Sequence, residues 1–321
     1  MANQVSSGGT VPQDALLFPP LEAGSFRRSL ASAWAPWRKR PLGVFGALII
    51  MLACLLAVAA PILAPHAPSE FAGRRLESPS SEHLLGTNTL GQDVLSRTLY
   101  GAQVSIAVAI ASTVLGVGTG TILGVISAFY GGWIDLIVQR VMEVLASFPG
   151  LILVLMIVAA LGKPSAAREG SLVYLMWDLR SLSIAIAAGL VFGVMRVIRS
   201  AVLKERSLPY IEAARTIGAS PLRIMVRHIV PNVFPYVIVT FSSIVGFIIL
   251  LEAGISFIGY GVSIGTASWG SDLSGTNRDY FLTAPWVMLG PGIALTLTVM
   301  GANFLGDTLR DILDPRLRGS R

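Results

Sequence analysis

The stretch SLPYIEAARTIGASPLRIMVRHIVPN, residues 207–232, is polar enough to lie in water, yet long apolar runs stand directly before and after it. Ser207 and Pro209 favour the start of a helix, and Gly218 favours its end, because glycine adopts a left-handed backbone without steric cost. A serine and a proline at 220–221 then open a second helix in the same way. The stretch therefore predicts two short helices joined by a tight corner.

Both helices carry apolar residues at helical spacing, which predicts one apolar edge on each. The expected edge residues are Ile211, Ala214 and Ile217 in the first helix, and Leu222, Met225 and Ile229 in the second. Three interpretations fit this pattern: a surface for another protein, a loop that packs back on its own membrane domain, and a DNA-binding helix-turn-helix. The last is disfavoured because both ends of the stretch are held close to the bilayer.

The composition of the chain is that of a polytopic membrane protein. Of its 321 residues, 53% are hydrophobic and only 13% are charged, whereas soluble domains carry roughly 25% charged residues. The mean hydropathy is +0.70. The single cysteine, Cys54, lies inside an apolar run, so an internal disulfide is impossible.

Six apolar runs are long enough to cross a bilayer, which takes roughly 20 residues. They lie at about 42–63, 103–129, 140–161, 182–203, 233–258 and 285–306. Most of the Lys and Arg residues fall before the first run, in 196–227 and after the last run, which predicts that these regions are cytoplasmic. Arg196 and Arg199, in the fourth run, are expected to reach the interface with their charged ends. The expected fold is an all-α bundle of six transmembrane helices with both termini in the cytoplasm.

The predicted organisation follows from these runs. We expect a disordered tail at 1–26, an amphipathic segment and the first span at 27–63, an external loop at 64–102, a core with five more spans at 103–306, which includes a cytoplasmic loop at 204–232, and a cytoplasmic tail at 307–321. The segment before the first span carries Trp34 and Trp37 among basic residues, so it predicts either a helix on the inner leaflet or an ordinary charged juxtamembrane anchor.

Within the opening stretch, EAARTIGASPLRIMVRHIVPN resembles the EAA loop of ABC importer permeases. The positions that match the family pattern are Glu212, Ala213, Ala214, Gly218 and Pro231. Val230 stands where the pattern has leucine, and the isoleucine falls one place late at Ile229. The resemblance implies a type I permease fold, in which the first helix docks in a groove of an ATPase subunit and transmits its closure to the membrane helices.

The external loop narrows the resemblance, because HLLGTNTLGQDVLSRTLYGAQVS, residues 83–105, is similar to C-type subunits of dipeptide and oligopeptide permeases. The agreeing positions are His83, Leu85, Gly86, Thr87, Leu90, Gly91, Asp93, Val94, Leu95, Ser96, Arg97, Tyr100, Gly101 and Ser105. Asn88, Gln92 and Gln103 depart from the pattern, and the first two remove charges. LLEAGISFIGYGV and LGDTLRDILDPRLRG, later in the chain, are similar to the same subfamily.

This resemblance implies a permease subunit in the bacterial inner membrane that imports di- or oligopeptides. Its implied partners are a homologous B-type permease, two ATPase subunits that hold ATP and magnesium, and an external substrate-binding protein. Relatives also carry nickel, haem or other small solutes, so these remain alternative substrates. No cofactor, metal ion or nucleic acid is expected on this chain. A self-sufficient channel or ion-coupled carrier, and a membrane-bound scaffold or regulator, are the rival classes.

Two features inside the spans are candidates for packing or function. Gly116, Gly120 and Gly124 clear one face of the second span for tight helix contact, either with this chain's own bundle or with a partner permease. Glu252 is a carboxylate well inside a span, which predicts either a functional group or a protonated or arginine-paired structural one.

The sequence contains no recognisable catalytic site, and the chain is not expected to be an enzyme. LGKPS, residues 161–165, resembles part of a phosphate-binding loop but lacks the required Gly at 157 and the Ser or Thr at 164. His83 and Asp93 alone are too few for a metal site. Asp93 and Arg97, four residues apart, are expected to form a weak ion pair on a helix surface.

Overall fold

The computed structural model describes residues 40–162, 172–263 and 265–313. The chain divides into a unit of residues 1–39 and a unit of residues 40–321, and the description concerns the second. The predicted disordered tail, nearly all of the amphipathic segment and the end of the C-terminal tail therefore lie outside the described residues.

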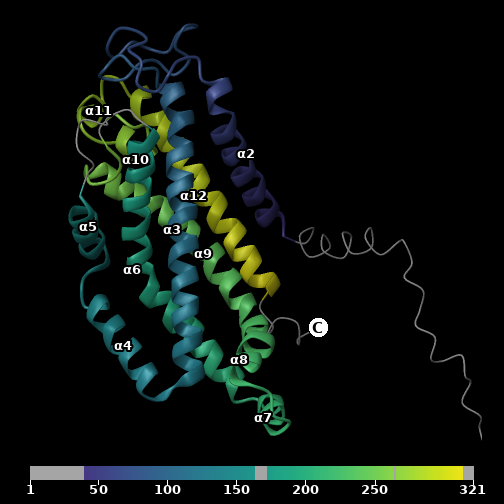
Figure 1. The fold of residues 1–321 in the computed structure, drawn as a ribbon. Helices are drawn as coiled ribbons and strands as arrows, with labels where there is room; N and C mark the ends of the chain where they lie inside the picture. The colour runs from purple at the N-terminus through teal and green to yellow at the C-terminus, as the bar shows by residue number, and fades with distance from the viewer. Residues whose placement is uncertain (1–39, 163–171, 264, 314–321) are drawn as a thin grey trace, which may run out of the picture. The chain divides into compact units, whose positions relative to one another are not determined.

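Long helices make up the described unit (Figure 1). They are α2 Pro41–Leu63, α3 Val94–Tyr130, α6 Leu172–Arg206, α9 Val230–Phe257 and α12 Trp286–Leu313. Within the described residues, five helices are long and apolar enough to cross a membrane, and a bent pair makes up to six. Two helices extend beyond the expected spans, because α3 begins at Val94 within the expected external loop and α12 continues to Leu313 within the expected C-terminal tail.

The third expected span, 140–161, is not one straight helix. It is divided between α4 Gly132–Ala146 and α5 Gly150–Leu161, whose axes differ in direction by 91°. Pro149 stands at the break in an extended conformation. Proline lacks a backbone N–H and disfavours helical geometry in the residue before it, so the helix ends ahead of it.

The contact between α3 and α6 is close because glycine lines it. A Cβ atom placed on Gly120 would lie 2.7 Å from Cβ of Val194, and one on Gly124 would lie 2.9 Å from the carbonyl oxygen of Met195. Gly116 meets Leu190 in the same way. The glycines at 116, 120 and 124 thus face α6 of the same chain.

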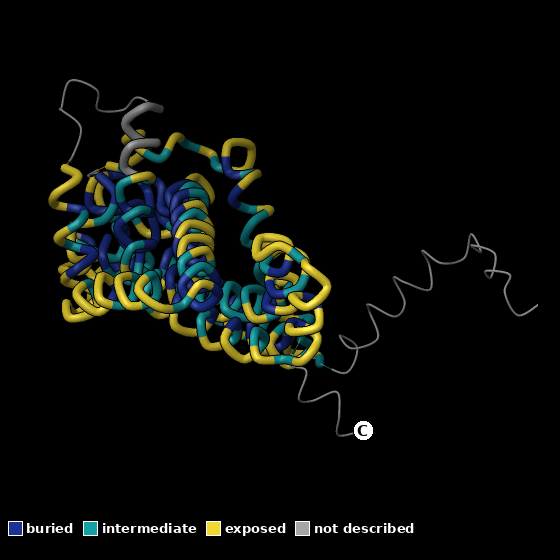
Figure 2. Tube along the Cα trace, turned by 60° about the horizontal axis from the view of Figure 1, so that its bottom comes forward, coloured by how far each residue is buried: buried dark blue, intermediate teal, exposed yellow. Residues whose placement is uncertain are grey.

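A second close contact joins the first long helix to the last. Gly43 and Gly46 of α2 lie against Thr308 and Gly301 of α12. The side chains of Arg40 and Asp311 form an ion pair at the same end of this contact. Figure 2 shows buried residues where helices face one another and exposed residues on the outward sides. Large apolar side chains such as Val58 and Ile62 are exposed there, which suits a surface surrounded by lipid or another membrane protein.

Short helices lie at both ends of this bundle. At one end are α7 Pro209–Thr216, α8 Pro221–Ile224 and the π-helix η3 Met225–Ile229, and at the other are α10 Trp269–Asp272 and α11 Thr276–Asp279 (Figure 1).

Candidate functional site

The 207–232 segment folds as the two helices and corner that its sequence predicts. Gly218 adopts a φ of +81°, and the hydroxyl of Ser220 accepts a hydrogen bond from the amide of Arg223 at 3.3 Å, which caps α8. The expected cap at Ser207 was wrong. Its hydroxyl donates instead to the carbonyl of Lys204 at 2.8 Å, and Leu208 is the residue before α7.

One side of the segment is buried against the long helices. Its buried members are Ile211, Ala214, Ile224 and Ile229, and they share a hydrophobic cluster with Val125, Phe129, Ile198 and Val202. These partners belong to α3 and α6, so the segment shares one hydrophobic cluster with the pair of helices that the glycine contact holds together. Within the segment, α7 contacts α8, and η3 contacts α6.

The opposite side of the segment exposes apolar surface. Ile217 is 85% exposed, Leu222 is 61% exposed and Val226 is 56% exposed. Glu212 and Ala213 are exposed as well. A group of exposed large apolar residues on a segment that faces water indicates a surface that another protein covers. The expected apolar edges are thus divided, because Ile211, Ala214 and Ile229 are buried whereas Ile217 and Leu222 are exposed.

The exposure of Leu222, and the burial of Ile224 instead, follow from the wide turn of η3. In an α-helix, residues five positions apart point in different directions, whereas a π-helix has a longer repeat. Ile224 and Ile229, five apart, are both buried, and the amide of Val230 donates to the carbonyl of Met225. Pro231 follows directly; in an α-helix its ring would clash with the carbonyl of Arg227, and the wider turn relieves that clash.

Three polar side chains meet at the end of α6 and the starts of α7 and α9, and we name them the Glu205–Tyr210–Asn232 cluster. The hydroxyl of Tyr210 donates to Oε1 of Glu205. The side-chain amide of Asn232 donates to the same Oε1 at 3.0 Å, to the Tyr210 hydroxyl at 2.9 Å and to the carbonyl of His228 at 2.9 Å. Burial and the hydrogen bond to Glu205 raise the pKa of Tyr210, whose phenol therefore keeps its proton and remains a donor.

Comparison with known proteins agrees with this geometry. A family described as binding-protein-dependent transport system inner membrane component matches residues 120–319. A second family, the N-terminal TM domain of oligopeptide transport permease C, matches residues 29–79. The chain belongs to these permease families. The resemblance found in the sequence is confirmed, and the protein is a membrane permease subunit of an ABC importer.

Named relatives cover most of the permease. A putative peptide transport system permease protein of Brucella suis biovar 1 is 39% identical over 85% of this chain and 87% of its own length. A dipeptide transport system permease protein of Alkalihalophilus pseudofirmus is 36% identical over 89% and 92%. A glutathione transport system permease protein of Pectobacterium atrosepticum is 35% identical over 94% and 95%.

At the end of the permease opposite to α7, Arg97 joins three separate segments. Its Nε donates to Oδ1 of Asp272 at 2.8 Å, and its Nη1 donates to the carbonyl of Pro68 at 2.9 Å and to Oε1 of Gln92 at 3.0 Å. Both charged side chains are buried. The expected surface pair of Arg97 with Asp93 was wrong, because Arg97 turns to a residue 175 positions away in the chain.

Asp93 has a different role, as the cap of α3. Its Oδ2 accepts from the amide of Ser96 at 2.8 Å, and its Oδ1 lies 3.1 Å from Nδ1 of the buried His83. Within the described part of the chain, no group of three His, Cys, Asp or Glu side chains is placed to hold a metal ion. The three departures from the family pattern also have partners, since the side-chain amide of Asn88 donates to Oε1 of Gln92 at 3.0 Å and that of Gln103 donates to the carbonyl of Ala57 at 2.7 Å.

A polar cleft of about 270 Å³ lies beside Arg97. Asn88, Thr89, Asp272 and Asn277 contribute to its lining. The hydroxyl of Thr89 donates to Oδ1 of Asn277 at 2.8 Å, which connects the segment before α3 to α11. The hydrogen bonds of this region therefore tie the loop of residues 64–93 to the loop of residues 258–285.

Glu252 is fully buried near the end of α9 on the Arg97 side. Its Oε1 accepts from the hydroxyl of Ser256 at 2.8 Å, while its Oε2 is buried without a hydrogen-bond partner among the described residues. The expected alternative of an arginine partner was therefore wrong. A functional role for Glu252 remains a prediction from the sequence.

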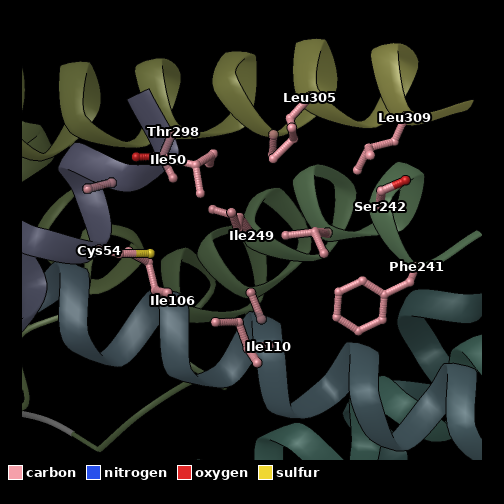
Figure 3. Close-up of a pocket in the computed structure, with 14 residues that line it drawn as sticks. Ile50, Cys54, Ile106, Ile110, Phe241, Ser242, Ile249, Thr298, Leu305 and Leu309 are labelled. Carbon is pink, nitrogen blue, oxygen red and sulfur yellow. The ribbon is translucent and has the colours of Figure 1, made fainter. Parts of the chain in front are cut away.

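An apolar pocket of about 230 Å³ lies between α2, α3, α9 and α12 (Figure 3). Figure 3 shows Ile50, Ile106, Ile249 and Phe241 around it, together with the thiol of Cys54. Its lining is largely apolar, and the hydroxyls of Ser242 and Thr298 donate to backbone carbonyls of their own helices.

Proposed function

We propose that this permease imports di- or oligopeptides as one of two membrane subunits of an ATP-driven transporter. The observation that carries the proposal is the 207–232 segment, which combines a buried base on α3 and α6 with an exposed apolar surface. The names of the relatives support peptide as the substrate class, since they include peptide, dipeptide and glutathione permeases. Membership in the binding-protein-dependent transport family supports the proposed partners, which are a second permease, two ATPase subunits and a binding protein.

In this assembly two ATPase subunits bind ATP and magnesium, and a homologous permease completes the membrane domain. The ATPase covers Ile217, Leu222 and Val226, with Glu212 and Ala213 on the same exposed helix surface. Ala214 lets α7 lie close to its base, Gly218 provides the corner, and Pro231 ends the segment. The complex, rather than this chain, hydrolyses ATP.

We further propose that both termini and the 207–232 segment face the cytoplasm. Basic residues support this orientation, because Arg215, Arg223 and Arg227 lie in the segment and Arg310 near the C-terminal end. With the bent pair α4 and α5 counted as one crossing, six spans place both termini on one side. The Arg97 end then faces outward, where an external binding protein delivers the peptide to the surface formed by the loops of residues 64–93 and 258–285.

The peptide path lies between the two permeases in this proposal. The apolar pocket among α2, α3, α9 and α12 supports that placement, because its largely apolar lining offers few hydrogen-bond partners for a peptide backbone. Alternating exposure of the path to either side of the membrane follows from rotation of the two permeases against each other, which the ATPases drive through α7.

The test is co-purification and reconstitution. The permease, purified from membrane with its neighbours intact, should bring along ATPase subunits, and vesicles that contain the complex should import peptide only with ATP and the binding protein. Glu212→Lys should abolish import while the subunit still reaches the membrane. Transport by this chain alone, without ATP, would contradict the proposal and favour a self-sufficient channel or carrier. The ligand that the binding protein retains on purification identifies the substrate and separates peptide from nickel or haem.

A further inference from the structure

We propose that the Glu205–Tyr210–Asn232 cluster is a releasable contact that sets the position of α7 relative to α6 and α9 during the transport cycle. This inference rests on the proposed function, since it assigns positioning residues to the same ATPase contact. It names Glu205, Tyr210 and Asn232, none of which belongs to the EAA pattern.

The cluster joins three elements that a moving α7 must carry with it. Glu205 lies in the last turn of α6, Tyr210 in the first turn of α7 and Asn232 in the first turn of α9. One oxygen, Oε1 of Glu205, accepts from both of the other side chains. A displacement of α7 therefore changes its contact with the helix that precedes it and with the helix that follows it.

Asn232 has more hydrogen-bond acceptors within reach than hydrogens to donate, so it can release its contact with α7. A side-chain amide has two N–H hydrogens, yet its nitrogen lies within 3.0 Å of the acceptors on Glu205, Tyr210 and His228. Loss of the Tyr210 contact leaves Asn232 with two acceptors for its two hydrogens. Because Asn232 stays satisfied either way and the exposed hydroxyl of Tyr210 can donate to water instead of Glu205, α7 can leave this position without leaving a buried donor unpaired.

The neighbouring turn of the chain is suited to such a change. The carbonyl of His228 that Asn232 contacts belongs to η3, and the rings of Tyr210 and His228 lie 6.2 Å apart. π-helical turns occur frequently at functional sites. A shift of α7 thus reaches α9 through a wide turn rather than through a regular α-helix.

The cluster lies apart from the buried apolar residues of the segment, so its role in positioning α7 can be tested without unfolding the segment. Tyr210 and Asn232 are exposed, and the buried base of the segment is formed by Ile211, Ala214 and Ile224 instead. Removal of the cluster's hydrogen bonds therefore leaves the apolar base in place. The expected consequence is a permease that assembles but couples poorly.

The experiment uses the full complex in vesicles, with its ATPases and binding protein, and measures peptide imported per ATP hydrolysed. Tyr210→Phe removes only the hydroxyl and Asn232→Leu removes the amide. Both should lower the import ratio about three-fold or more, because Tyr210→Phe removes two hydrogen bonds and Asn232→Leu removes three. Asn232→Gln, which keeps an amide donor, should recover part of the ratio. Tyr236→Phe, the same change on α9 outside the cluster, should match wild type.

Co-purified ATPase, measured for every variant, verifies that the complex has assembled. Import ratios for Tyr210→Phe and Asn232→Leu equal to that of Tyr236→Phe would overturn the role of the cluster and leave the proposed function intact. An equal loss in Asn232→Gln and Asn232→Leu would overturn the hydrogen-bond argument. A wild-type complex that hydrolyses ATP without importing peptide would overturn both proposals together.

Discussion

Arg199 of α6 makes two parallel hydrogen bonds to the carboxylate of Asp135 in α4, from Nε to Oδ1 at 2.8 Å and from Nη2 to Oδ2 at 2.6 Å. The hydroxyl of Ser127, in α3, donates to the same carboxylate. Together these contacts attach α4 to α6 and α3. The sequence predicted only that the charged end of Arg199 reaches the interface, because a partner 64 residues away gives no local indication.

Replacement of either member of this pair should loosen α4. Arg199→Lys keeps the positive charge but cannot make the two parallel hydrogen bonds of a guanidinium, and Asp135→Asn removes the negative charge. The expected loss of stability is roughly 1–3 kcal/mol, the range for hydrogen bonds to charged groups, and nearer its lower end because the pair is partly exposed. Thermal unfolding of the complex in detergent measures it. Arg140→Gln, which breaks a fully surface-exposed pair with Glu143, should change the melting temperature little; an equal drop would argue against the special role of Arg199.

A larger effect is expected at the opposite end of the bundle. Arg97→Met leaves Asp272 as a buried charge without its partner, which typically costs about 3–5 kcal/mol. The double change Arg97→Met with Asp272→Leu removes that charge as well, so part of the stability should return. Recovery is incomplete because the carbonyl of Pro68 and Gln92 also lose a donor. Thermal unfolding of single and double variants decides the matter: a double variant no better than Arg97→Met would show that the ion pair is not the main contribution.

The helix contact between α3 and α6 offers a matched pair of glycines. Gly120→Leu should push the helices apart, because even a Cβ at that position lies 2.7 Å from Val194, and overpacking typically costs about 1–3 kcal/mol. Gly118→Leu, on the same helix, meets nothing within 4 Å in this chain. It should leave the unfolding of the isolated subunit unchanged or slightly improved. Equal destabilisation by both variants would contradict the assignment of the 116–124 face to α6.

The corner at Gly218 permits a test of backbone conformation alone. A Cβ there meets nothing within 4 Å, so a substitution acts through the φ of +81°. Valine in this region costs roughly 1–2 kcal/mol, whereas asparagine tolerates it better. ATP-dependent import should therefore fall with Gly218→Val and be largely kept with Gly218→Asn. Full import by the valine variant would show that the left-handed corner is dispensable.

Local features of the fold were predictable from the sequence, and long-range ones were not. Apolar runs revealed the long helices, and Gly218 with Ser220 and Pro221 revealed the corner of the 207–232 segment, because hydropathy and capping depend on neighbouring residues. The bend between α4 and α5 was missed although Pro149 stood in the run. A proline in an apolar stretch was not a sufficient indication, because Pro235 and Pro291 lie inside the continuous helices α9 and α12.

The π-helix and the polar clusters lay beyond sequence reasoning for different reasons. One extra residue in the turn at Met225–Ile229 shifts the buried face, so an α-helical repeat selected Leu222 instead of Ile224. The cluster of Glu205 with Asn232 and the pair of Arg97 with Asp272 depend on how distant helices meet. Likewise, Gly43 and Gly46 gave no indication of the contact with α12, since their spacing is common in unpaired segments.

The break at Pro149 has a consequence for hydration. At 1.5 Å per residue, the 12 residues of α5 extend about 18 Å, well short of the roughly 30 Å hydrocarbon thickness. If the bent pair forms one crossing, as proposed, the 91° break places the first amides of α5 inside the bilayer, where hydrocarbon cannot bond them. In that arrangement, water or a second polypeptide must reach Gly150.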